Sequence, residues 1–321
     1  MPKKIKIIFL GTSAFGVPLY EAIGQDARFE LVLTVSQPDA RAGRGRQIRP
    51  STIKTIAQKH NWPVITPAGI KDASNTISSL RPDLLVLCSY GQIVPSEILA
   101  IPRFKALNIH ASPLPRYRGA ACVQAAILNG DQESGLTLMQ MDTGLDTGPI
   151  IAQKKIKLNG RETSPLLLEI LSQAAPDFFR ENIILWLEQK ITPRPQVEKD
   201  ASYAPKLTKE DGLIDWQQPN IKIDRQVRAL LPWPGTYTFL PDRKYLKILS
   251  GFPGQPVAAA KPGEIQYIGN EFAVACLKSY FILGKIQLSG GRPLEAKIFF
   301  NGHKEYLGKN FFSAPDCKIE S

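Results

Sequence analysis

The chain has 321 residues, of which 43% are hydrophobic and 21% are charged, so one large domain or two ordinary domains are expected. No apolar run approaches the roughly 20 residues of a membrane span, and the first residues lack the cleavage site of a signal peptide. The formal net charge of +11 favours an anionic partner such as nucleic acid or a polyanionic small molecule, although a generally basic surface would give the same balance.

Four cysteines and three histidines are scattered along the chain. The cysteines form no Cys-x-x-Cys pair, which predicts that there is no zinc site and that the compartment is reducing. They are Cys88, Cys122, Cys276 and Cys317.

Short apolar segments alternate with helical segments in the first half of the chain. This alternation predicts a doubly wound, mostly parallel α/β sheet with helices on both faces, and ligands bind such sheets beyond the carboxyl ends of the strands. A helix with a Ser/Thr start is expected at residues 51–60. Strands are expected at residues 5–10, 31–36, 62–66, 84–89 and 106–110.

The second half of the chain changes in character. Residues 165–189 predict a strongly apolar helix, and residues 192–209 are rich in Pro and charge, as linkers are. Short alternating segments separated by Gly and Pro follow, which is typical of a small β-barrel. We therefore expect a catalytic domain at 1–191, a linker at 192–209 and a barrel domain at 210–321.

Asn108 and His110 are the first candidate site residues. They are two apart on a predicted strand, so both side chains point to the same side. An amide and an imidazole can converge there on one carbonyl oxygen, which is the equipment for stabilising an oxyanion in acyl transfer. The alternative is a histidine that is merely hydrogen-bonded in a Pro-rich turn.

A carboxylate that fixes the histidine ring would complete such a site. The segment QMDTGLDTGPI offers Asp142 and Asp146, with Asp146 as the candidate, although Asp in a Gly-Thr turn is commonly a turn former. No Gly-x-Ser-x-Gly nucleophile and no phosphate-binding loop is found, so a covalent acyl-enzyme is not expected.

The segment RAGRGR at residues 41–46 is the second candidate. Its arginines, Arg41, Arg44 and Arg46, are separated by small residues and cannot build a core. They form either a solvated loop or a basic arm that becomes ordered on nucleic acid, because arginine grips phosphate with two hydrogen bonds.

An ordered series of segments along most of the chain resembles the methionyl-tRNA formyltransferase family. The Asn-x-His and Asp elements are common to folate-dependent formyltransferases, whereas the arginine loop and the C-terminal segments point to the tRNA enzymes. The segments are IIFLGTSAFGVP (7–18), QPDARAGRGR (37–46), NIHASPLPRYRGAA (108–121), MQMDTGLDTGPI (139–150), YAPKLTKEDGLIDW (203–216), VRALLPWPGTYT (227–238) and FFNGH (299–303).

The resemblance implies transfer of a formyl group from 10-formyltetrahydrofolate to the α-amino group of initiator methionyl-tRNA, without a metal. It implies a Rossmann-like catalytic domain with Asn108, His110 and Asp146 as catalytic residues, and an OB-like barrel that binds tRNA. It places the tRNA acceptor stem at Arg41, Arg44 and Arg46, and suggests a monomer in the bacterial cytoplasm. The folate-binding turn falls on Ser112, Pro113, Leu114 and Pro115.

Three departures from the family pattern are visible. Pro113 replaces the usual Leu and lacks a backbone donor, Cys122 stands where Pro is frequent, and Ala40-Arg41 replaces Arg-Pro. Two other hypotheses remain open. One is a formyltransferase of the same core that acts on an amino-sugar nucleotide or a purine precursor, and the other is a non-catalytic RNA-binding protein that keeps the fold.

Overall fold

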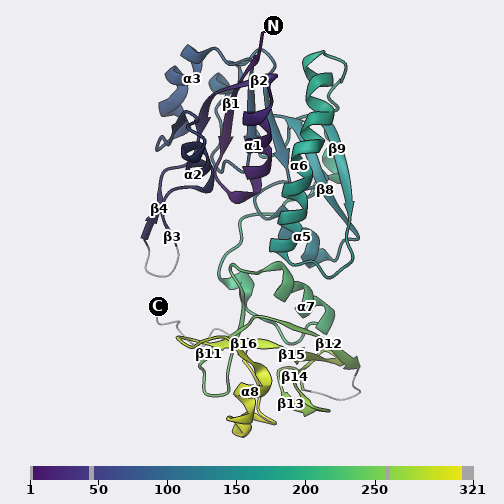
Figure 1. Ribbon diagram of the computed structural model, residues 1–321. Helices are drawn as coiled ribbons and strands as arrows, with labels where there is room; N and C mark the ends of the chain where they lie inside the picture. The colour runs from purple at the N-terminus through teal and green to yellow at the C-terminus, as the bar shows by residue number, and fades with distance from the viewer. Residues whose placement is uncertain (1–2, 43–46, 257–260, 313–321) are drawn as a thin grey trace. The chain divides into compact units, whose positions relative to one another are not determined.

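The computed structural model describes residues 3–42, 47–256 and 261–312. The chain forms two compact units (Figure 1). Unit 1 comprises residues 1–122, 133–157 and 166–205, and unit 2 comprises residues 123–132, 158–165 and 206–321. Within the described ranges no helix has the length and apolarity needed to cross a bilayer. The domain limits expected from the sequence stay a prediction.

Unit 1 is built on a seven-stranded sheet in the order β5-β2-β1-β6-β7-β8-β9. The first five strands in this order are parallel, and β8 and β9 are antiparallel to their neighbours, which confirms the predicted mostly parallel α/β sheet. The strands are β1 (Ile5–Gly11), β2 (Phe29–Val35), β5 (Val64–Ile65), β6 (Leu84–Cys88), β7 (Ala106–His110), β8 (Glu133–Gln140) and β9 (Ile150–Lys157).

Helices cover both faces of this sheet, which explains why β1 is a continuous apolar run. Phe9 packs its ring against Tyr20 of α1, with centroids 4.8 Å apart. Ile8 points to the other face and shares a buried cluster with Ile77 of α3. The helices of the unit are α1 (Val17–Gln25), α2 (Thr52–Lys59), α3 (Ser74–Leu80), α4 (Ser96–Leu99) and most of α6 (Ser164–Leu187).

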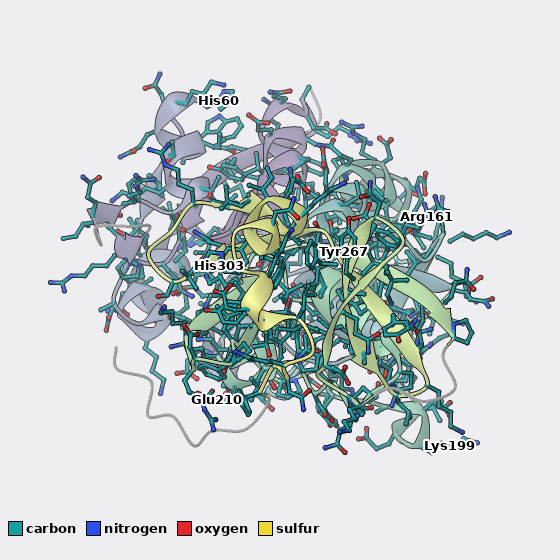
Figure 2. All side chains as sticks on the ribbon, turned by 90° about the horizontal axis from the view of Figure 1, so that it is seen from below. His60, Arg161, Lys199, Glu210, Tyr267 and His303 are labelled. Atoms are coloured by element: carbon teal, nitrogen blue, oxygen red, sulfur yellow. The ribbon has the colours of Figure 1, made fainter. Side chains whose placement is uncertain are left out.

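The helix starts follow local chemistry. The Ser51 side chain accepts a hydrogen bond from the Lys54 N–H at 3.0 Å and so caps α2, as the Ser/Thr signal predicted. One set of apolar residues of α6, which includes Leu167 and Phe179, is buried, whereas Leu166, Ile170 and Leu185 are exposed. Charged side chains such as Lys199 project outward from the ribbon (Figure 2).

The direction of β8 decides where the following loop begins. In the antiparallel pair, His110 at the end of β7 faces Thr137, whereas Gln140 at the end of β8 faces Leu107 near the start of β7. The N–H of Met141 then donates to the Ala106 carbonyl at 2.8 Å. A residue in this loop must therefore come back along β7 to reach His110.

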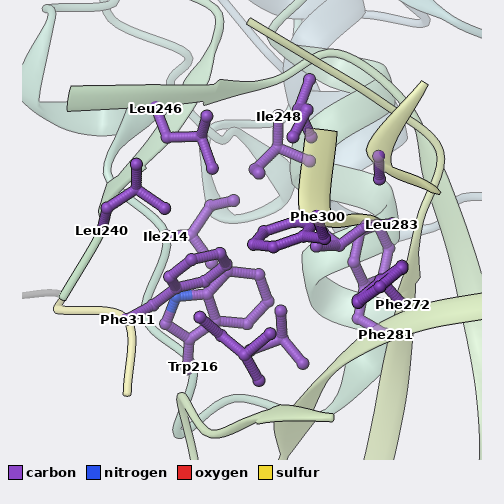
Figure 3. Packing of buried hydrophobic residues seen from close by; sticks show 14 of the residues in the cluster. Ile214, Trp216, Leu240, Leu246, Ile248, Phe272, Phe281, Leu283, Phe300 and Phe311 are labelled. Atoms are coloured by element: carbon purple, nitrogen blue, oxygen red, sulfur yellow. The ribbon is translucent and has the colours of Figure 1, made fainter. Parts of the chain in front are cut away.

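Unit 2 contains two four-stranded antiparallel sheets around one apolar core. Trp216 is 1% exposed and lies among aromatic and aliphatic side chains of both sheets, such as Leu246 and Phe281 (Figure 3). This agrees with the predicted small β-domain. The strands are β10 (Thr236–Phe239), β11 (Tyr245–Ile248), β16 (Lys285–Leu288) and β17 (Leu294–Glu295), and β12 (Gly251–Pro256), β15 (Ser279–Leu283), β14 (Glu271–Cys276) and β13 (Ile265–Ile268).

The α-helices described in unit 2 were not predicted from the sequence. Helix α7 (Asn220–Ala229) is mostly polar and buries only Ile223, Val227 and Ala229, and α8 (Ala296–Asn301) is short. Most of α5 (Cys122–Asn129) also belongs to this unit. Short or polar helices give a weak apolar periodicity, which is the signal on which prediction depends.

Candidate active site

Asn108 and His110 lie on β7 with their side chains on one side, as predicted, and Ile109 between them is 2% exposed. Asn108 is partly exposed, and its amide makes no hydrogen bond with residues 3–42, 47–256 or 261–312. An amide with free donors at the end of a buried strand is available to a ligand.

The His110 ring is held between a carbonyl and a carboxylate. Its Nε2 is 3.0 Å from the Tyr117 carbonyl oxygen, and its Nδ1 is 3.6 Å from Asp146 Oδ2. The side chains of His110 and Asp146 are 9% and 14% exposed, respectively. A carbonyl only accepts, so Nε2 carries a proton and donates it. A second proton on Nδ1 would face the carboxylate, so this environment suits an imidazolium.

The pKa of His110 reflects these contacts. Burial lowers the pKa, but Cys122, Asp146 and the Tyr117 carbonyl together raise it from its ordinary 6.5 to about 9. Among these partners Asp146 is the carboxylate, and its Oδ2 faces Nδ1 at 3.6 Å, where its negative charge favours the imidazolium.

Residues 110–121, here called the histidine loop, are fixed by hydrogen bonds to the neighbouring strands. Thr137 Oγ1 donates to the Ser112 carbonyl at 2.7 Å and accepts from the Leu114 N–H at 3.1 Å. Gln153 Nε2 donates to the Leu114 carbonyl at 2.7 Å. These bonds hold the loop against β8 and β9.

Four residues of the histidine loop were predicted to bind folate. Ser112 is fully buried and its hydroxyl donates to the Arg116 carbonyl at 2.7 Å, so its side chain is already engaged. Leu114 is buried as well, whereas Pro113 and Pro115 are half-buried. Their role in folate binding stays a prediction.

Residues 141–149, here called the aspartate loop, contain both candidate carboxylates. Asp142 accepts hydrogen bonds from the Gly144 N–H and from Thr147 Oγ1, so it is a turn former. Asp146 has a left-handed backbone with φ +54°, and its Oδ2 accepts from the Gly119 N–H at 2.8 Å. Asp146 is therefore the carboxylate that meets His110, as the sequence analysis expected.

Exposed apolar side chains lie in the segments around this polar group. Ile93, which follows β6, is 81% exposed, and Leu145 in the aspartate loop is 56% exposed. Leu145 is close enough to Gly119 that a Cβ built there would be 3.6 Å from its Cδ2. Ser89 at the end of β6 has φ +53°, and such backbone outliers cluster at functional sites.

The predicted arginine arm is only partly described. Arg41 is exposed on β3 (Ala40–Ala42), which pairs with β4 (Gln47–Arg49) in a hairpin that extends away from the seven-stranded sheet (Figure 1). Arg44 and Arg46 lie outside the described residues. The contact of these arginines with nucleic acid stays a prediction.

Several groups at the site were not identified from the sequence. The Tyr117 carbonyl and the Gly119 N–H carry no side-chain signal, although the glycine itself has φ +106° and a Cβ there would be 2.8 Å from the Ala204 oxygen. Cys122 was noted as unusual but not as a partner of His110. Within the described ranges no three His, Cys, Asp or Glu side chains are grouped so as to hold a metal ion.

Known proteins resemble this chain over nearly its whole length. The family described as formyl transferase matches residues 3–182, and the family described as formyl transferase, C-terminal domain, matches residues 206–304. The methionyl-tRNA formyltransferase of Geobacter sulfurreducens is 38% identical over 307 residues, which cover 94% of each chain. That of Nitrosomonas eutropha is 36% identical over 310 residues, covering 96% of this chain and 98% of the relative.

Solved structures share the fold at lower identity. An N-formyltransferase from Helicobacter canadensis, in complex with folinic acid and dTDP-3-aminofucose, has a TM-score of 0.67 and 21% identity, covering 87% of this chain and 98% of its own. A sugar 3N-formyl transferase with dTDP and 5-N-formyl-THF has a TM-score of 0.64, also at 21% identity, covering 88% and 97%. On the matches to whole-length relatives and to both family domains, the chain belongs to the methionyl-tRNA formyltransferase family.

Proposed function

We propose that this protein transfers a formyl group from 10-formyltetrahydrofolate to the free α-amino group of initiator methionyl-tRNA. One observation carries the chemistry: the Asn108 amide, which has no hydrogen-bond partner among the described residues, lies two residues from a His110 ring that is bound to the Tyr117 carbonyl and faces Asp146 at 3.6 Å. The names of the whole-length relatives support the choice of substrate.

The residues around the trio suit a folate. A pteridine is flat and partly apolar, and the exposed side chains of Ile93 and Leu145 offer it contact area. The two structural neighbours were solved with folate derivatives, which supports a folate-derived donor. When bound, that donor supplies the formyl carbon that the amine attacks.

The chain's own residues then act on charge and protons. The Asn108 amide donates to the formyl oxygen as that oxygen gains negative charge. His110, positively charged below its pKa of about 9, adds electrostatic stabilisation from within a buried site. Asp146 keeps the ring charged and oriented. Because both ring nitrogens then carry protons, a water next to the ring takes the proton that the amine must lose and passes it to the folate nitrogen, which leaves as its bond to the formyl carbon breaks.

The acceptor would be held by positive charge. Arg41, Arg44 and Arg46 would contact tRNA phosphates, and the net charge of +11 would draw the polyanion to the protein. We place the protein in the bacterial cytoplasm, where initiator tRNA is formylated, and expect it to act as a monomer.

The test is formyl transfer from 10-formyltetrahydrofolate to initiator methionyl-tRNA by the wild type, His110→Ala and Arg44→Ala. We expect a fall in kcat for His110→Ala, and for Arg44→Ala a rise in KM for tRNA that becomes larger with added salt. If the protein formylates an amino-sugar nucleotide or a purine precursor but not tRNA, the proposed formyl-transfer chemistry stands and methionyl-tRNA is rejected as the acceptor. Salt-sensitive RNA binding without any formyl transfer would favour the alternative of a non-catalytic RNA-binding protein.

A further inference from the structure

A segment of unit 1 that is remote in sequence runs beside both loops of the site. Residues 194–204, here called the strap, begin with a reciprocal pair of backbone hydrogen bonds between Arg194 and Ile150, both 2.8 Å long. The strap ends with a similar exchange: the Arg118 N–H donates to the Ser202 carbonyl, and the Ala204 N–H donates to the Arg118 carbonyl, both at 2.8 Å. It therefore touches the end of the aspartate loop and the histidine loop.

Both the nitrogen and the oxygen of the Gln196 side-chain amide, in the strap, make hydrogen bonds. Its Nε2 donates to the Asp146 carbonyl at 2.7 Å and to the Gly148 carbonyl at 2.8 Å. Its Oε1 accepts from Arg118 Nε at 3.1 Å. One side chain thus joins the backbone of the aspartate loop to a side chain of the histidine loop.

Arg118 provides a fixed anchor for that amide. It is 1% exposed, and its guanidinium also donates to both Glu198 oxygens, at 3.0 and 2.9 Å, and to the Tyr203 hydroxyl at 3.0 Å. A buried charge with several partners has few alternative positions. Gln196 is consequently held on one side and holds the Asp146 backbone on the other.

Asp146 needs such support for two reasons. Its left-handed φ of +54° still costs free energy relative to ordinary backbone, although Asp adopts it more readily than most residues, so contacts to this backbone help to hold it. Its loop also begins near the start of β7, so the strand geometry alone does not bring the carboxylate to His110.

We propose that Gln196, anchored by Arg118, is a positioning residue that fixes the Asp146 backbone so that its carboxylate faces His110. The expected effect on kcat rests on the proposed function, because it is measured as formyl transfer. Its structural consequence, the distance between Asp146 and the His110 ring, can be measured without any substrate.

The matched pair of variants is Gln196→Leu and Gln226→Leu. Gln226 in unit 2 makes the same kind of contact, since its Nε2 donates to the Asp211 and Leu213 carbonyls at 2.8 and 3.0 Å. A third variant, Gln196→Glu, retains an acceptor for Arg118 but cannot donate to the two carbonyls. For each protein we would measure kcat, both KM values, thermal stability and the NMR titration of His110, which is one of only three histidines.

We expect both Gln196 variants to lower kcat on the order of 100-fold, with little change in either KM, because a shift of about 1 Å at a reacting group has that effect. The His110 titration should move to lower pH, because Asp146 no longer stabilises the imidazolium. Gln226→Leu should leave kcat and the His110 titration unchanged. A wild-type kcat and titration in Gln196→Leu would overturn the inference, as would equal effects in Gln226→Leu. An inactive wild type would reject the proposed function, whereas the titration would still decide the positioning role.

Discussion

The histidine loop and the aspartate loop each supply one side of the ion pair, but they are held in different ways. The histidine loop follows directly from β7 and is bonded to Thr137 and Gln153 on the adjacent strands. The aspartate loop starts from the other end of β7 and is held through Gly119 and Gln196, which are distant in sequence. A strand end thus positions one half of the site, and long-range contacts position the other.

The largest expected effect comes from Asn108, which lies on β7 and takes no part in the contacts that hold the two loops. Asn108→Ala should lower kcat by about 100- to 1000-fold, because it removes a donor to the developing oxyanion. Single-turnover transfer would measure this. Thermal stability should not change, since the amide has no partner among the described residues, and a wild-type kcat would exclude Asn108 from that role.

Gly119→Ala would break the connection between the two loops. With φ +106° and a Cβ only 2.8 Å from the Ala204 oxygen, the residue must shift, and its N–H would leave Asp146. We expect a loss of about 1 to 3 kcal/mol of unfolding free energy, measured by denaturant titration, and a kcat lowered by roughly tenfold or more.

The control for this substitution is Gly160→Ala. Gly160 has φ +79°, but a Cβ there would have nothing within 4 Å. Gly160→Ala should also lose unfolding free energy, because alanine disfavours a positive φ, but it should leave kcat unchanged. If it lowered kcat as much as Gly119→Ala, the effect would be a general one and not a loss of the Asp146 contact.

The ion pair between the loops should also be visible in stability. Because the pKa of His110 is raised from 6.5 to about 9, the folded state binds the proton more tightly than the unfolded state. The stabilisation is complete below pH 6.5 and is lost as pH rises through about 9. The free energy of unfolding of the wild type should therefore decrease over this range.

Asp146→Asn should weaken that decrease, because it removes a charge that raises the pKa of His110. Denaturant titrations of both proteins at intervals between pH 6 and 9.5 would compare the slopes of unfolding free energy against pH, which for one proton are on the order of 1 kcal/mol per pH unit in the wild type. Equal slopes would mean that the ring does not sense the aspartate loop.

The smallest expected effect is that of Cys122, which lies beside the histidine loop. Cys122→Ala should leave kcat near pH 7 within about twofold, since the Asp146 carboxylate still faces the ring at 3.6 Å and favours its charged form. The alkaline limb of the pH-rate profile should move to lower pH, because Cys122 raises the pKa of His110. A large loss at pH 7 would instead give this thiol a direct role in the chemistry.

Much of the fold follows from patterns that the sequence displays. Buried strands such as β1 and β6 are continuous apolar runs, and Ser51 marks the start of α2. The pair of Asn108 and His110 was predicted because strand periodicity puts both on one side. These features depend on residues that are close in sequence.

Other features depend on contacts that a pattern does not encode. The antiparallel direction of β8, the left-handed backbone of Asp146 and the amide of Gln196 all arise from pairing between distant segments. Nothing in a lone glutamine within a Pro-rich, charged segment marks it as a neighbour of an aspartate fifty positions earlier. The catalytic assignments of Asn108, His110 and Asp146 await the variants described above.

The course of the strap has a consequence for dissecting the chain. A fragment that stopped at residue 191 would omit Gln196, Glu198 and Tyr203, so the Arg118 guanidinium would lose the partners that the strap gives it. A fragment that stopped at residue 205 would retain every one of these bonds and all of unit 1. Protease sites or fusion junctions intended to keep unit 1 intact therefore belong after residue 205, even though the Pro-rich, charged composition predicts a linker from residue 192.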